Sequence, residues 1–126
     1  MNEQAAALQE RTFRFALRTA RFLRTLSDDH QSRHIADQLF RSSSGTAYNY
    51  RRACRGQSHR DFTAKLATAH EEADESVFWL LFTKRGGYAT GTELEYLLGE
   101  SSELLAILTA SVKTAQERQQ HHKRQA

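Results

Sequence analysis

Apolar residues recur along the chain every three to four positions, the spacing of a helix that buries one face. Four such stripes predict helices over about 3–26, 31–55, 59–84 and 92–119. Polar or glycine-containing segments separate them, and Ser58 followed by Asp61 has the pattern of a helix N-cap. The expected inward positions are Leu8, Thr12, Phe15, Thr19, Phe22, Leu23, Leu26; Ile35, Gln38/Leu39, Ser42, Thr46, Tyr50; Phe62, Leu66, Ala69, Ala73, Val77, Leu80/Leu81; and Leu94, Leu97/Leu98, Leu104/Leu105, Leu108, Val112.

The three connections are short, so consecutive helices should run antiparallel. The predicted fold is all-α, an antiparallel up-down-up-down four-helix bundle formed by residues 1–119. Residues 120–126 are polar and basic, and we expect them to form a disordered tail.

The middle of the second predicted helix consists of small residues over 42–47. Taken alone, this segment could be a loop. The helical stripe resumes in register beyond it, which favours a continuous helix. Small side chains would let a neighbouring helix approach closely, offsetting the poor helix propensity of Ser and Gly.

Composition supports a reducing, aqueous environment. Proline is absent, and the single cysteine, Cys54, has no partner for an internal disulfide. The first ten residues lack the apolar stretch of a signal peptide, and the longest apolar runs are too short to span a bilayer. We therefore expect a cytoplasmic protein without a membrane partner.

Charge is distributed unevenly beneath a net charge of +3. Residues 1–55 carry 10 basic and 5 acidic side chains, residues 56–111 carry 4 and 9, and residues 112–126 carry 4 and 1. This distribution favours either attraction between helices or a basic face for a polyanion.

Four arginines on the first predicted helix share a face: Arg11, Arg14, Arg18 and Arg21. We place this face roughly opposite the Phe15 and Phe22 core stripe. Arginine is always charged and binds phosphate with a bidentate fork, so a stripe of four could follow a nucleic-acid backbone. A solvated face, or pairing with acidic residues, explains the same pattern.

A second basic group, Arg51, Arg52 and Arg55, follows Arg41 on the second predicted helix. An acidic group, Glu71, Glu72, Asp74 and Glu75, lies on the third. Antiparallel packing could pair the two groups. A di-iron site is the alternative, but it needs Glu-x-x-His motifs from two helices. The chain has none, so we expect no metal.

Extra apolar residues lie off the core stripes. Phe13 and Leu17 form a second line on the first helix, and Phe78, Trp79 and Phe82 exceed what one face of the third can bury. Such surface is typical of an oligomer interface, with a wide core as the alternative.

The sequence contains no recognisable catalytic motif. His70 has no nucleophile and orienting group spaced to complete a triad, and Cys54 is better explained as a half-buried structural thiol. Neither Gly86-Gly87 nor Gly91 has the context of a phosphate-binding loop. We expect no enzyme activity and no cofactor.

Several ordered motifs resemble the four-helix-bundle proteins encoded in 23S rRNA intervening sequences. They are Gln38-Leu39-Phe40-Arg41-Ser42-Ser43, Ser44-Gly45-Thr46-Ala47-Tyr48-Asn49-Tyr50, Ser58-x-x-Asp61-Phe62-x-x-Lys65-Leu66, Glu71-Glu72-Ala73-Asp74-Glu75-Ser76-x-Phe78-Trp79-Leu80 and Arg11-Thr12-x-x-Phe15-Ala16. One departure is Arg52, where many members have Glu, so the local positive charge is higher here.

The resemblance implies a homopentameric ring and kinship with the accessory protein of diversity-generating retroelements, which binds nucleic acid and a reverse transcriptase. Our leading hypothesis is a non-enzymatic oligomer that binds RNA or DNA through its basic helix faces, without reading bases. The alternative is a protein adaptor, for example to a reverse transcriptase, without a nucleic-acid role.

Overall fold

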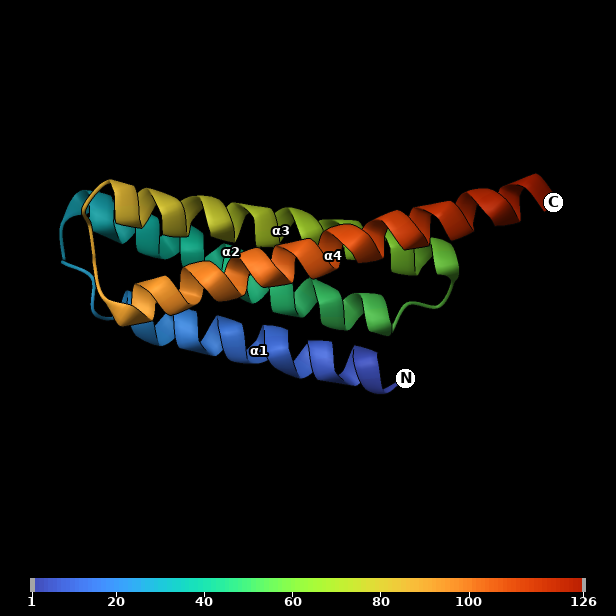
Figure 1. Ribbon diagram of the computed structural model, residues 1–126, viewed down its shortest axis with the longest axis horizontal. Helices are drawn as coiled ribbons and strands as arrows, with labels where there is room; N and C mark the ends of the chain where they lie inside the picture. The colour runs from blue at the N-terminus through green and yellow to red at the C-terminus, as the bar shows by residue number, and fades with distance from the viewer. Residues whose placement is uncertain (1, 126) are drawn as a thin grey trace.

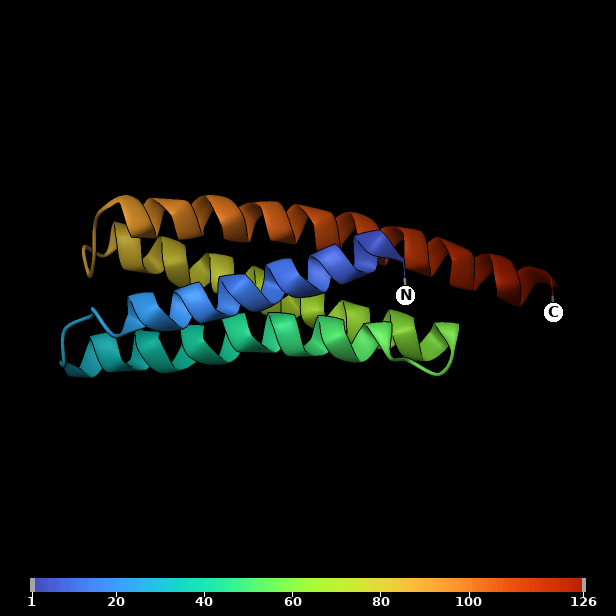
Figure 2. The same ribbon diagram turned by 90° about the horizontal axis from the view of Figure 1, so that it is seen from below.

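The computed structural model describes residues 2–125 and contains four α-helices. They are α1 (Glu3–Leu23), α2 (His30–Cys54), α3 (His59–Arg85) and α4 (Thr92–Gln125). Figures 1 and 2 show them running alternately up and down, so the predicted antiparallel bundle is confirmed.

Short polar side chains start three of the helices. The side chain of Asn2 accepts from the Ala5 amide at 2.7 Å, Asp29 from Ser32 at 2.9 Å, and Ser58 from Asp61 at 3.0 Å. Each satisfies an amide that the first helical turn leaves without a partner. The Ser58 cap was predicted from the sequence.

The helices form a square. Consecutive helices pack side by side, and α1 completes the square by packing against α4. Within residues 2–125, the backbones of the diagonal pairs α1–α3 and α2–α4 do not approach each other closely. Two apolar clusters fill the interior. The cluster towards the α1–α2 and α3–α4 connections contains large residues such as Phe15, Leu39 and Leu97. The other contains Tyr50 and Leu66 among several alanines.

The segment of small residues is helical, as predicted, and lies in the α2–α3 contact. Ser42 and Thr46 are fully buried, and the Ser76 hydroxyl on α3 donates to Ser42 Oγ at 2.9 Å and to the Glu72 carbonyl at 3.0 Å. A Cβ at Gly45 would stand 3.1 Å from Glu72 Cδ. Small side chains therefore allow the close approach of these two helices.

Two predicted helix ends are wrong. α1 ends at Leu23, before Leu26, because a hydrogen-bonded turn at 24–26 already bends the chain towards α2. α4 continues to Gln125, through most of the segment expected to be disordered; Ala126 lies outside the described residues. Residues 116–125 contain no Gly or Pro and several good helix formers, and they extend beyond the other helices (Figure 1).

Candidate nucleic-acid interface

The arginine stripe of α1 faces α4, contrary to our placement opposite the core. Arg11 makes a bidentate pair with Glu100, Nε to Oε2 at 2.9 Å and Nη2 to Oε1 at 2.6 Å. Its Nη2 also lies 3.3 Å from Glu103 Oε2. The hydrogen bond to Glu100 raises the pKa of Arg11 above its ordinary value. Arg11 therefore joins two helices.

Arg14 and Arg18 are also paired with carboxylates. Arg18 Nε donates to Glu93 Oε1 on α4 at 2.7 Å, and its guanidinium lies 3.5 Å from the centre of the Tyr96 ring. Arg14 Nε donates to Glu10 at 2.9 Å, one turn earlier on the same helix. These two pairs and the Arg11 pair offset much of the positive charge of the stripe.

Arg21, the fourth member, is exposed and forms no side-chain hydrogen bond or ion pair within residues 2–125. The stripe flanks the core on the α4 side because its centre lies roughly 80° from Phe15 at about 100° per residue. An extended face of four free arginines is therefore not formed.

The second basic group does not pair with the acidic group of α3. Only Arg41 does so: its Nη1 lies 3.4 Å from Glu72 Oε2, and its Nη2 contacts Glu75. Because α2 and α3 run antiparallel, the last residues of α2 lie beside the first residues of α3. Arg51, Arg52 and Arg55 consequently lie level with the start of α3, beyond the acidic residues.

The side chain of Glu72 is largely buried in this cluster. Burial raises the pKa of its carboxyl, although Arg41 opposes the shift. Glu75 also accepts from Trp79 Nε1 at 3.3 Å. The Arg41–Glu72–Glu75 cluster thus acts as a structural link between α2 and α3.

At one end of the bundle α2 ends, α3 begins and α4 projects (Figures 1 and 2). These helix segments are rich in basic residues. His59 at the start of α3 connects to α4: its Nε2 lies 2.9 Å from the Ala115 carbonyl oxygen, and its ring centre lies 5.9 Å from that of His122. We define the basic end by Arg51, Arg52, Arg55, Arg60, Arg118, Lys123 and Arg124.

Few carboxylates compensate the basic end. Asp61, at the start of α3, accepts from Lys65 at 2.9 Å, and this hydrogen bond lowers the pKa of Asp61, with a smaller contribution from the charge of Arg52. Glu3 and Glu117 are the other acidic residues in the helix segments that meet there. None of the seven basic side chains forms an ion pair within residues 2–125.

Sequence reasoning identified three members of the basic end and missed four. Arg60 follows Arg55 by five residues, across the α2–α3 connection. Arg118, Lys123 and Arg124 are distant in sequence and lie on the second half of α4, which reaches the same end of the bundle (Figure 1). The basic character of residues 112–126 was the available signal, but a tail treated as disordered has no fixed position.

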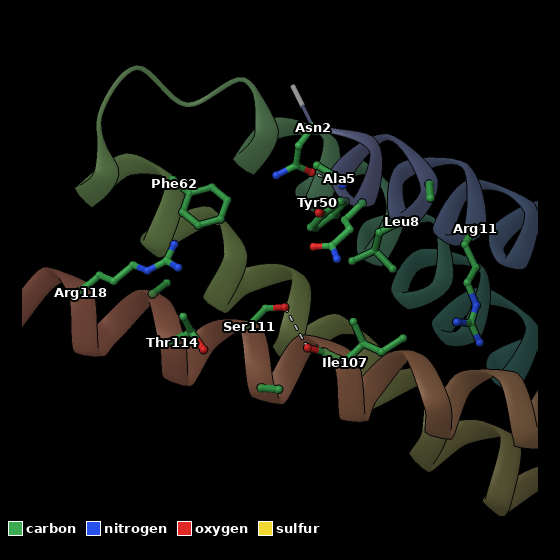
Figure 3. A pocket seen from close by; sticks show the side chains of 14 residues that line it. Asn2, Ala5, Leu8, Arg11, Tyr50, Phe62, Ile107, Ser111, Thr114 and Arg118 are labelled. Atoms are coloured by element: carbon green, nitrogen blue, oxygen red, sulfur yellow. Dashed lines mark hydrogen bonds between the residues drawn. The ribbon is translucent and has the colours of Figure 1, made fainter.

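A hollow of about 610 Å³ lies between the first turns of α1 and the second half of α4 (Figure 3). Leu8, Tyr50, Phe62 and Ile107 contribute its apolar lining, while Arg118 lies towards one end and Arg11 towards the other. Burial raises the pKa of Tyr50, which also interacts with Cys54. Cys54 itself is half-buried, in agreement with a structural thiol.

The predicted apolar surface is largely exposed. Phe13 and Leu17 on α1, and Phe78 and Phe82 on α3, point away from the core; Phe13 is 56% exposed and Phe78 is 54% exposed. Trp79 differs, because it is half-buried, packs on the core and has its ring centre 5.7 Å from that of His34. Phe40 and Tyr48 on α2 are exposed too and were missed, because neither has a second large apolar residue one helical turn away.

The remaining sites offer no reactive arrangement. His70 Nε2 lies 2.9 Å from Thr109 Oγ1, an exposed contact between α3 and α4. No three His, Cys, Asp or Glu side chains converge on a possible metal position within residues 2–125. Across the same residues, none of the helices has the length and apolarity needed to cross a bilayer.

Comparison with known proteins agrees with this architecture. A solved structure from Bacteroides thetaiotaomicron, described as a protein of unknown function from the S23 ribosomal protein family, superposes with a TM-score of 0.78 and 28% sequence identity, covering 86% of this chain and 97% of that one. No curated protein matches significantly. The family model for the 23S rRNA-intervening sequence protein matches residues 5–110. The chain therefore belongs to the 23S rRNA-intervening sequence protein family.

Proposed function

We propose that this protein is a non-enzymatic, self-associating helical bundle that binds the phosphate backbone of nucleic acid, RNA or DNA, through its basic end. The observation that carries the proposal is the contrast between the two arginine groups. Three arginines of the α1 stripe are paired with carboxylates. Within residues 2–125, Arg51, Arg52, Arg55 and the other cations of the basic end form no ion pair.

Unpaired arginines bind phosphate more readily than paired ones, because no internal ion pair has to be broken first. Arginine also forms bidentate contacts with phosphate oxygens. The proposed contacts are to phosphates, which carry no sequence information, so binding should be governed by charge. Its affinity should then fall steeply with salt, since each phosphate contact releases condensed counterions.

The test compares two variants that lose the same charge. One replaces Arg51, Arg52 and Arg55 by Gln. The other replaces by Gln the exposed Arg14 and Arg21 of α1 and Arg24, the residue that caps the end of α1. Fluorescence anisotropy with a labelled structured RNA and a duplex DNA would be measured at several salt concentrations. We expect the first variant to lower the slope of log affinity against log salt by about 2 to 3. The second should change it little.

Two results would overturn this proposal. Equal losses in both variants would show that net charge, and not the basic end, determines binding. Absence of binding by the parent protein at low salt would remove nucleic acid as the partner. Circular dichroism of each variant would establish that the helices are intact.

Self-association is supported by the position of the exposed apolar residues. Phe13 and Leu17 lie on the outer face of α1, and Phe78 and Phe82 on the outer face of α3, the diagonal helix. Two different patches on opposite sides favour head-to-tail contacts, which close into a ring when the rotation between copies permits. The family resemblance suggests five subunits.

Native mass spectrometry tests the assembly. Replacing Phe78 and Phe82 by Ser should reduce the parent oligomer to smaller species, because the α3 patch would lose most of its apolar area. Replacing Phe40, which is exposed on α2 and belongs to neither patch, is the matched control. A monomeric parent protein at micromolar concentration would refute the assembly.

A second candidate function is that of an adaptor for a protein such as a reverse transcriptase. The exposed ring of Phe40 supports this adaptor role, because it belongs to neither the α1 patch nor the α3 patch and would stay accessible in the proposed oligomer. Binding of a purified reverse transcriptase that persists after nuclease treatment and is lost on replacing Phe40 by Ser would favour the adaptor over the nucleic-acid binder.

A further inference from the structure

Tyr48 stands on the outer face of α2 immediately before the arginines of the basic end. It is 61% exposed, the most exposed of the large hydrophobic side chains described. Arg51, Arg52 and Arg55 follow at three, four and seven residues, which places all four side chains on one helix face. An aromatic ring and three cations therefore share one accessible strip.

A buried side chain orients this strip. Asn49 is 8% exposed, and its amide donates to the Gly45 carbonyl at 2.8 Å. Its Oδ1 accepts from Arg52 Nη1 at 3.3 Å. The Arg52 guanidinium in turn lies 5.6 Å from the centre of the Tyr48 ring. Arg52 is thus held between Asn49 and the ring, while Arg51 and Arg55 make no ion pair within residues 2–125.

The chain contains a second tyrosine–arginine pair with the opposite character. Arg18 lies directly over the Tyr96 ring at 3.5 Å, and Glu93 neutralises it. Arg18 therefore covers a face of the Tyr96 ring, and Glu93 is the anionic partner of Arg18. At Tyr48 the ring is more exposed and its arginine has no carboxylate partner. This site retains both of the groups that a nucleotide would engage.

We propose that Tyr48 is a stacking platform for an unpaired base, with Arg51, Arg52 and Arg55 holding the flanking phosphates. This inference rests on the proposed function and specifies its substrate class: single-stranded segments or loops. The face of a base is available to an aromatic side chain only when the base is unpaired, because in a duplex neighbouring base pairs cover it. Stacking is tolerant of sequence, in keeping with binding that does not read base edges.

Affinity for matched oligonucleotides provides the first test. A labelled single strand of about 12 nucleotides, within the usual range of site sizes, would be compared with the duplex it forms with its complement. The parent should bind the single strand more tightly. Replacing Tyr48 by Leu should weaken single-strand binding by about 5- to 150-fold, the range found for loss of one aromatic–base stack. Duplex affinity should stay nearly constant.

Tyr96→Leu is the matched control, since it removes an exposed tyrosine beside an arginine from another face. Tyr48→Trp should retain single-strand binding, because indole stacks at least as well as phenol. In a Trp79→Phe background, the same Tyr48→Trp substitution gives a protein with one indole. Its fluorescence should be quenched by the single strand and not by the duplex.

The outcomes separate this inference from the function on which it rests. Unchanged single-strand affinity in Tyr48→Leu, while the basic-end arginines remain necessary, would overturn the platform and leave backbone binding intact. A change in oligomer mass without a change in affinity would also overturn it and assign Tyr48 to a protein contact. If the parent protein binds neither the single strand nor the duplex, the proposed function itself is refuted.

Discussion

The pair between Arg11 and Glu100 should be a structural clamp between α1 and α4, and not a phosphate site. We predict that Arg11→Met destabilises the fold without weakening nucleic-acid binding. The side chain of Glu100 is only 13% exposed and that of Arg11 is 34% exposed. Removing the arginine would therefore leave a largely buried carboxylate with no strong partner.

The magnitude follows from this intermediate burial. A fully exposed pair contributes about 0–1 kcal/mol, whereas breaking a buried one costs about 3–5 kcal/mol. The bidentate geometry and partial burial place the loss for Arg11→Met at about 2 kcal/mol. Glu100→Gln should cost about 1 kcal/mol, since Arg11 keeps Glu103 within 3.3 Å and reaches solvent. The double variant should cost less than the sum, by about 1 kcal/mol.

Urea unfolding followed by circular dichroism would measure these free energies at one fixed protein concentration, because assembly makes apparent stability depend on concentration. The double-mutant cycle isolates the pair. A coupling below about 0.3 kcal/mol would refute the clamp. A strong loss of nucleic-acid affinity in Arg11→Met, with stability unchanged, would instead return Arg11 to the phosphate-binding surface.

Three further substitutions test the packing, the cap and the buried acid. Ser42→Leu should destabilise the fold by about 2 kcal/mol or more by forcing α2 from α3, whereas Ser44→Leu, less buried, should be nearly neutral in the same urea assay. Ser58→Ala should lower stability by about 1 kcal/mol through loss of the α3 cap; an unchanged unfolding midpoint would show that the cap is dispensable. Burial raises the pKa of Glu72 in the folded protein, so its contribution to stability is present below the ordinary pKa of about 4.3 and lost as pH rises through the folded value. Glu72→Gln should therefore flatten the decline in unfolding free energy as the pH rises above about 4.3, and an unaltered pH profile would contradict the shift.

Periodicity in the sequence was enough to predict the helices, because burial of one face repeats with the helical turn. The small residues at 42–47 illustrate this: their propensity is poor, yet the stripe through Ser42 and Thr46 stayed in phase with Leu39 and Tyr50, and all four are buried. Helix ends were less predictable. The end of α4 was set by local propensity, which we underestimated in a polar segment.

The candidate site was predictable only in part. Arg51, Arg52 and Arg55 could be recognised as a group, because they are close in sequence. The role of Arg11 could not, since its distance from Glu100 depends on how α1 lies against α4. The same holds for Trp79. Its helical phase put it off the core stripe of α3, yet His34 of α2 packs against its ring.

The sequence by itself therefore determined the number and type of elements, their antiparallel order and most of the core, because these depend on local periodicity and short connections. The tertiary structure alone decided which charges cancel. It paired Arg11 and Arg18 of α1 with α4 carboxylates 89 and 75 residues away, and it left Arg51, Arg52 and Arg55 without an ion pair within residues 2–125. Ion pairing depends on distances of a few ångströms between helices, and the one-dimensional pattern of charge does not contain them.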